Sequence, residues 1–116
     1  MTMLWGCSSG ALRALGSFDR TGTPYNYMLA GCPALVANLW DVTDRDIDKF
    51  AQSVFDRLGL SPETIGGRRK HSHQQQQSGE RPSVSVTSAV AQSRDVCKLK
   101  YLTGAAVVVY GVPVYL

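Results

Sequence analysis

The sequence lacks the features that define several large classes of protein. No apolar run approaches the roughly 18 residues that a membrane-spanning helix needs, so we expect no membrane partner. The three cysteines are an odd number without paired spacings, which argues against a disulfide framework and against a redox pair. Free thiols suit a reducing compartment, and the chain is therefore predicted to work in the nucleus and cytoplasm.

Concentrated positive charge and metal-ligand clusters are also missing. The net charge is only +3 and is spread along the chain, which argues against a nucleic-acid-binding face. The two histidines, His71 and His73, stand in a polar stretch without a set of cysteine or carboxylate ligands beside them. The sequence therefore predicts neither a metal site nor a cofactor.

The composition that is present is typical of one small domain with a polar insertion. Hydrophobic residues make up 44% of the chain and charged residues 18%, as in ordinary globular domains. Residues 61–82 differ, because glycines, a basic triplet and four consecutive glutamines leave too few apolar side chains to offset the entropy of ordering. We predict a folded part over residues 1–60, a disordered insertion over 61–82, and the last helix and strand of the same domain over 83–116.

Apolar patterns predict an α/β fold. The nearly unbroken apolar run over residues 33–40 is typical of a strand covered on both faces in a parallel sheet. A helix predicted over residues 25–30 would form the crossover that leads to this strand. Apolar residues then recur at helical spacing over 47–58, and Thr43 followed by Asp46 resembles a capping box at the start of that helix.

Shorter patterns predict the remaining elements. A helix is expected over residues 11–15, and a surface loop over 17–24. One helix face is expected over 84–97, and the β-branched run over 104–110 predicts a buried final strand.

One cysteine lies where chemistry is expected. A short apolar strand over residues 3–5 leads to Cys7, which places its thiol at the carboxyl end of a strand, where open α/β sheets keep their sites. A helix starting after Ser8 or Ser9 would favour the thiolate, and its N–H groups could hold an oxyanion. The alternative is a buried structural cysteine, and spacing alone does not separate the two interpretations.

An acidic cluster stands at the start of the helix expected over residues 47–58. Asp44 and Asp48 lie four residues apart and so share a helix face, whereas Asp46 lies elsewhere on the helical wheel. Aspartates in this position usually cap the helix and interact with its dipole. A carboxylate that faced a guanidinium instead would form a bidentate pair selective for arginine.

Several blocks of residues carry a resemblance to a known family. They are Gly6-Cys7-Ser8-Ser9 with Ala11-Leu12, Tyr27-Met28 with Ala30-Gly31-Cys32-Pro33, the run from Asn38 to Asp48, and a C-terminal group comprising Lys100-Tyr101-Leu102, Gly104-Ala105-Ala106, Tyr110-Gly111 and Pro113-Val114. In this order they resemble the end of the catalytic domain of separase, the caspase-like cysteine endopeptidase that opens cohesin at anaphase.

The resemblance implies a fold and a set of site residues. The fold would be a caspase-like three-layer α/β/α sandwich with a mostly parallel sheet, incomplete at its N-terminal side. Cys7 stands at the family's nucleophile, and its backbone N–H would help to bind the oxyanion. Asp48 is the residue expected to bind the arginine before the cleaved bond, with Asp44 second and Asp46 ranked below both.

The implied function is cleavage after arginine in the kleisin subunit of cohesin, which releases sister chromatids, with securin as an inhibitory chaperone. The family's catalytic histidine lies upstream of the cysteine, and none of the six residues before Cys7 is a histidine. The fragment alone is therefore predicted to be inactive. The alternative is a non-catalytic separase-like binding module or a truncated gene product, whose binding would not need the thiol.

Overall fold

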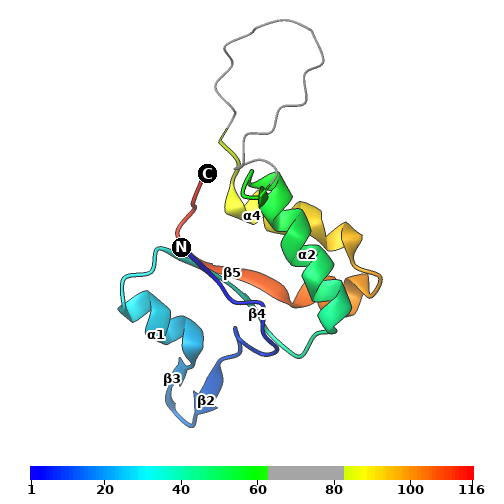
Figure 1. Cartoon of the computed structure of the whole chain (residues 1–116). Helices are drawn as coiled ribbons and strands as arrows, with labels where there is room; N and C mark the ends of the chain where they lie inside the picture. Colours follow the sequence, from blue (N-terminus) through cyan, green and yellow to red (C-terminus); the bar gives the residue numbers. More distant parts are fainter. Residues whose placement is uncertain (63–82) are drawn as a thin grey trace, which may run out of the picture.

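The computed structural model describes residues 1–62 and 83–116, so the insertion predicted over 61–82 lies almost entirely outside the described residues. At its centre is a three-stranded sheet with the strand order β1-β4-β5 (Figure 1). β1 (Thr2–Met3) runs parallel to β4 (Ala34–Asn38), and β5 (Val107–Gly111) runs antiparallel to it. The mixed α/β class is confirmed, but these three strands form one parallel and one antiparallel pair rather than a mostly parallel sheet.

β4 is the central strand because its side chains are apolar on both faces. All five of its residues are buried, as the apolar run predicts. Val36 belongs to the core formed with the helices α2 (Asp44–Arg57) and α4 (Val86–Ser93), whereas Leu35 and Ala37 alternate with it and point to the other face. That second face is covered by α1 (Thr23–Leu29), which packs on β4 and lies across the sheet from α2 in Figure 1.

The helix α2 (Asp44–Arg57) forms most of the core opposite β4. Ile47, Phe50 and Val54 are buried at the predicted helical spacing. The helix ends where Gly59 adopts a positive φ of 69°, a conformation that favours glycine. The predicted capping box does not form, because the Thr43 side chain makes no capping hydrogen bond; the helix N-terminus is stabilised instead by acidic side chains in its first turn.

The indole of Trp5 joins the segment after β1 to α2. Its ring centroid lies 6.1 Å from that of Phe50, with an angle of 55° between the ring planes. It also lies 6.1 Å from Phe55, edge to face at 84°. These distances and angles are those that aromatic pairs prefer, so the chain just before Cys7 is packed firmly against the helix.

The helix α4 (Val86–Ser93) packs beside α2 and begins at Ser85, whose side chain accepts a hydrogen bond from Ser88 N–H. The buried side chains of its face are those predicted from the sequence, and they continue to Cys97. The 3₁₀ turn η1 (Arg94–Val96) and the π-helical turn η2 (Lys100–Gly104) then lead into β5.

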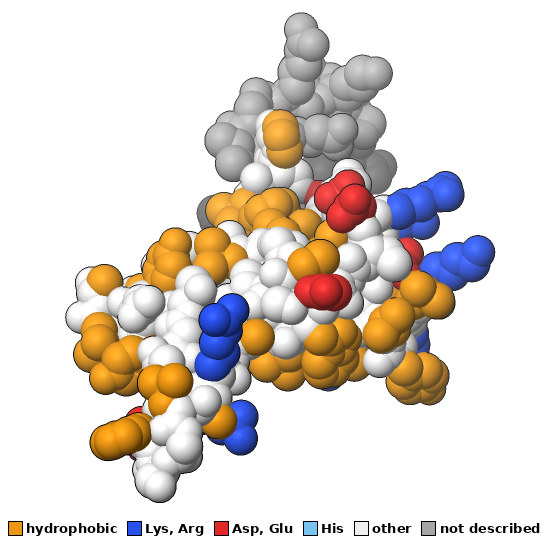
Figure 2. Space-filling model, turned by 90° about the horizontal axis from the view of Figure 1, so that it is seen from below, with side chains coloured by type: hydrophobic (Ala, Val, Ile, Leu, Met, Phe, Trp, Pro, Cys, Tyr) orange, Lys and Arg blue, Asp and Glu red, His pale blue; other side chains and the backbone are white. Residues whose placement is uncertain are grey.

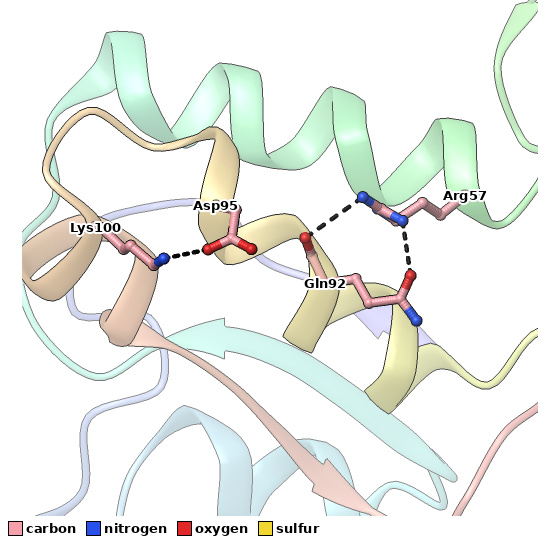
Figure 3. Close-up of polar contacts among 4 residues, drawn as sticks. All are labelled: Arg57, Gln92, Asp95 and Lys100. Atoms are coloured by element: carbon pink, nitrogen blue, oxygen red, sulfur yellow. Dashed lines mark hydrogen bonds and ion pairs between the residues drawn. The ribbon is translucent and has the colours of Figure 1, made fainter.

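Polar contacts extend the α2–α4 interface beyond the core. Arg57 donates to the side-chain oxygen of Gln92 at 2.7 Å and to its backbone oxygen at 3.4 Å (Figure 3). Lys100 and Asp95 form an ion pair nearby. Their attraction lowers the pKa of the Asp95 carboxyl and raises the pKa of Lys100.

A β-hairpin replaces the helix predicted over residues 11–15. β2 (Arg13–Leu15) pairs antiparallel with β3 (Phe18–Thr21), so the loop predicted over 17–24 is also wrong in part. A five-residue helix gains too few hydrogen bonds to repay its nucleation cost. Gly16, with a positive φ of 62°, instead begins a two-residue hairpin turn.

The surface carries many apolar side chains, as Figure 2 shows for the face seen from below. The hairpin and α1 contribute four that are largely exposed: Leu15, Phe18, Tyr25 and Leu29. None of the helices within 1–62 and 83–116 has the length and apolar character that a membrane span requires.

Candidate active site

Cys7 lies in a tight turn that follows β1, and the helix expected after it is not there. Residues 7–10 are a turn, and Ser8 has a positive φ of 52°, which only few non-glycine residues adopt. The N–H groups expected to begin a helix bond across to the neighbouring chain segment instead: Ser8 N–H to Trp40 O at 3.2 Å and Gly10 N–H to Asn38 O at 2.7 Å. The argument that a helix dipole favours the thiolate therefore fails.

The thiol of Cys7 is exposed and lies at the carboxyl end of β4. Its Sγ is 3.4 Å from the carbonyl oxygen of Val42, and the Val42 N–H points back to Sγ at 3.5 Å. The Cys7 N–H has no hydrogen-bond acceptor among the described residues. The location at a strand end is as predicted, and the exposure contradicts the alternative of a buried structural cysteine.

Two serines fix the turn to the chain segments on either side. Ser8 Oγ donates to the Asp41 carboxylate at 2.6 Å. Ser9 Oγ donates to Leu4 O at 3.1 Å and accepts a hydrogen bond from Asn38 N–H, also at 3.1 Å. No helix starts after either serine, and both brace the turn instead.

The three aspartates named from the sequence have different environments. Asp44 and Asp48 are exposed on α2, and neither forms an ion pair with any described residue. Asp46 is only 5% exposed, and its Oδ2 accepts a hydrogen bond from the Leu99 N–H at 2.7 Å. Asp46 therefore has a structural role in the fold.

Asp48 lines an open cavity of about 540 Å³ along the exposed side of α2. Ala51, Phe55 and Leu60 give the cavity an apolar floor, and Asp56 supplies a second carboxylate. Within the described part of the chain, no hydrogen bond joins Cys7 to Asp44 or Asp48. The assignment of the arginine-binding residue thus stays a prediction.

The other two cysteines serve the fold. Cys97 is buried, and its burial, together with the nearby charge of Asp46, raises the pKa of its thiol. Cys32 is half-buried beside the N-terminal strand, where its hydrogen bond with the Thr2 hydroxyl lowers its pKa. Across the two described ranges, no group of three or more potential ligands is arranged to hold a metal ion; His71 and His73 lie outside those ranges.

Sequence reasoning missed Asn38, the last residue of β4, which is fully buried directly behind the Cys7 turn. Its side-chain Nδ2 donates to the backbone oxygens of Trp5 at 2.9 Å and Gly6 at 3.1 Å. The available signal was a single polar residue at the end of an otherwise apolar buried strand, because such a group needs a specific partner.

Comparisons with known proteins all lead to the same group of proteins. The family model described as "Separin, protease domain" matches residues 1–47. The chain is 47% identical over 116 residues to separin of Schizosaccharomyces pombe, covering 100% of this chain and 6% of that protein. It is 50% identical over 113 residues to separin of Emericella nidulans, covering 97% and 5%. A crystal structure of the Saccharomyces cerevisiae separase–securin complex matches with a TM-score of 0.73 and 44% identity, over 97% of this chain and 7% of that chain.

The fold and these matches show the class of protein that the chain resembles, a segment of a protease domain. Along its whole length the chain is similar to separin, or separase. It spans about 6% of the length of the curated separins that it matches.

Proposed function

We propose that this chain is the part of a separase-type cysteine endopeptidase that carries the nucleophile. The observation that carries the proposal is the exposed thiol of Cys7, held in a braced turn at the end of β4 in a chain that matches separins along its whole length. The substrate would be the kleisin subunit of cohesin, cleaved after arginine in the nucleus or cytoplasm. The solved separase–securin complexes support securin as a partner, and its inhibitory role is part of the proposal.

The proposed reaction uses two groups of the Cys7 residue. The thiolate attacks the carbonyl carbon of the arginine residue, and the carbonyl oxygen becomes an oxyanion that accepts a hydrogen bond from the Cys7 N–H, which has no acceptor among the described residues. The amine leaves with a proton from a general acid, and water then hydrolyses the thioester. A histidine upstream of this segment would serve as that acid and base, as the family resemblance implies.

Asp48 is proposed to bind the arginine side chain. It is exposed, it lines a cavity with an apolar floor, and no cation among the described residues neutralises it. A guanidinium could lay its apolar stem on that floor and its charged end against the carboxylate. The caspase-like three-layer sandwich is part of the same proposal; the helices on both faces of β4 support it.

The test uses complete separase that contains this segment, with peptides that carry arginine or glutamine before the cleaved bond. Cys7→Ser should abolish cleavage. Asp48→Asn should lower kcat/KM for the arginine peptide about 10- to 100-fold, the value of one charge-assisted hydrogen bond, and should leave the glutamine peptide unchanged. Asp19→Asn, an exposed carboxylate on the hairpin, is the matched control.

Two outcomes would contradict the proposal. Equal loss of activity in Asp48→Asn and Asp19→Asn would remove Asp48 from the arginine site. Wild-type protein that binds securin but does not cleave, with binding unchanged in Cys7→Ser, would establish the non-catalytic binding module instead.

A further inference from the structure

The buried amide of Asn38 is a feature that neither the sequence pattern nor the proposed reaction accounts for. The residue is 0% exposed, and both hydrogens of its Nδ2 are used, one on Trp5 O and one on Gly6 O. The orientation of this amide follows from its partners, because the reverse orientation would place Oδ1 against two carbonyl oxygens. The Oδ1 atom has no hydrogen-bond donor within the described part of the chain.

An asparagine at this site is a poor choice for stability alone. A buried acceptor without a partner costs about 1–3 kcal/mol, and an apolar side chain would continue the β4 pattern without that cost. Buried polar groups that violate the rules of packing are expected at functional sites. The two bonds that Asn38 does make both lead to the chain just before Cys7.

The second of these bonds, at 3.1 Å, is the shorter of two that Gly6 O accepts, the other coming from the Ser9 N–H at 3.3 Å within the turn, and together they set the direction of one particular N–H group. Gly6 O and the Cys7 N–H belong to the same peptide unit, which is planar and trans, so the two bonds point in opposite directions within one plane. A donor that holds Gly6 O therefore also aims the Cys7 N–H. No cis peptide bond is present among the described residues.

The backbone of Asn38 holds the other end of the same turn. Its carbonyl oxygen accepts from Gly10 N–H at 2.7 Å, and its N–H donates to Ser9 Oγ at 3.1 Å. A Cβ built on Gly10 would lie 3.0 Å from Ala37 Cβ and 3.2 Å from Asn38 O, so the turn approaches β4 as closely as a glycine allows. Asn38 thus forms hydrogen bonds to the Cys7 turn on both sides of the cysteine, at Gly6 before it and at Ser9 and Gly10 after it.

We propose that Asn38 is a positioning residue, whose side-chain amide orients the Gly6–Cys7 peptide so that the Cys7 N–H points at the developing oxyanion. The inference rests on the proposed function, since it assumes that Cys7 attacks a carbonyl carbon. It predicts a loss confined to reactions in which an oxyanion forms. The attack of the same thiol on a saturated carbon needs no such donor and should be spared.

The test compares two reactions of Cys7 in complete separase carrying Asn38→Ala. Cleavage of an arginine peptide should lose about 10²-fold in kcat with KM little changed, as for removal of one oxyanion donor. A peptide aldehyde ending in arginine should bind less tightly by a similar factor. Its carbonyl carbon forms a bond to the Cys7 sulfur, and its oxygen becomes an oxyanion or accepts the thiol proton. Alkylation by iodoacetamide, in which sulfur displaces iodide, should change less than about threefold.

Asn38→Asp tests the same donor with a side chain of the same shape. Its carboxylate cannot donate to the carbonyl oxygens of Trp5 and Gly6, but its protonated form can donate to one of them. Hydrolysis by this variant, relative to wild type at each pH, should therefore recover in part as the pH falls. Val54→Ala, a core substitution in α2 away from the turn, controls for general loss of stability and should show no such selectivity.

The outcomes separate the two proposals. Equal losses in hydrolysis and alkylation, or wild-type kcat in Asn38→Ala, would overturn the positioning role while leaving the protease intact. The absence of Cys7-dependent cleavage in wild-type protein would overturn the proposed function, and the positioning role with it. If Asn38→Ala does not fold, the pH response of Asn38→Asp decides, and a flat ratio to wild type would refute the proposal.

Discussion

Replacing Asp46 should destabilise the chain, although this residue stands in a row of aspartates of which two are exposed. Its carboxylate is 5% exposed and accepts the Leu99 N–H at 2.7 Å, a contact that ties the first turn of α2 to the segment before η2. A hydrogen bond to a charged group contributes about 1.5–3 kcal/mol. An acidic residue in the first turn of a helix adds about 0.3–1 kcal/mol. Asp46→Ala should therefore lower the free energy of unfolding by about 2–4 kcal/mol.

Asp46→Asn should cost less, about 1 kcal/mol, because the amide oxygen still accepts from Leu99 N–H and only the charge is lost. The measurement is urea unfolding followed by tryptophan fluorescence, since Trp5 packs on α2 and reports its loss. Asp48→Ala is the matched control, because this aspartate is exposed on the same helix, and it should change stability by less than about 0.5 kcal/mol. Equal midpoints for Asp46→Ala and Asp48→Ala, or an Asp46→Asn variant as unstable as Asp46→Ala, would refute the structural role.

Three further predictions concern the rest of the fold. Gly111→Ala should lower the free energy of unfolding by clearly more than the roughly 1–2 kcal/mol of an ordinary left-handed residue, because its Cβ would lie 2.2 Å from a backbone oxygen at a φ of 110°. Gly16→Ala, at a φ of 62° in open space, should stay within that range. Equal shifts of the thermal midpoint in the two variants would contradict this. The Cys97 thiol is buried, and burial raises its pKa in the folded chain, so it should react with maleimide only as the chain unfolds; labelling of the native chain as fast as at the other two cysteines would be the opposite result. Ser53 and Ser93, joined by a 2.9 Å hydrogen bond between α2 and α4, should show a coupling energy of about 0.5–1.5 kcal/mol in a double-alanine cycle, whereas simple additivity would mean that the bond contributes nothing.

Elements with a full apolar pattern could be predicted from the sequence. The helix over residues 47–58 shows helical spacing across more than two turns, and the run over 33–40 is apolar on both strand faces. In each case hydrophobic burial dominates and the pattern states which side chains are buried. The core face of α4 could be predicted for the same reason.

Elements decided by a few hydrogen bonds could not be predicted in this way. Residues 11–15 were expected to form a helix. In so short a segment, the turn at Gly16 and the cross-strand pairing are more stable than a helix would be. Nothing in the run over 104–110 states whether the final strand lies parallel or antiparallel to its neighbour.

Part of the candidate site follows from local sequence, and part depends on contacts between distant segments. The place of Cys7 at a strand end follows from local sequence, and the structure confirms it. The burial of Asp46 depends on Leu99, more than 50 positions along the chain, and the contact of Asn38 with Gly6 joins segments 32 residues apart. Contacts of this range are formed by the tertiary fold and leave no spacing pattern to detect.

The packing of Trp5 against two phenyl rings of α2 has a mechanical consequence. Cys7 lies two residues beyond the indole and Asp48 is carried by α2 itself, so the proposed nucleophile and the proposed arginine-binding carboxylate sit on a single stiff unit. A ligand that merely tilts the helix carries both groups with it and leaves their spacing unchanged. To separate the two groups, an inhibitor would have to displace the indole of Trp5 from Phe50 and Phe55. An inhibitor that covered the Cys7 turn from the solvent side would leave this packing intact.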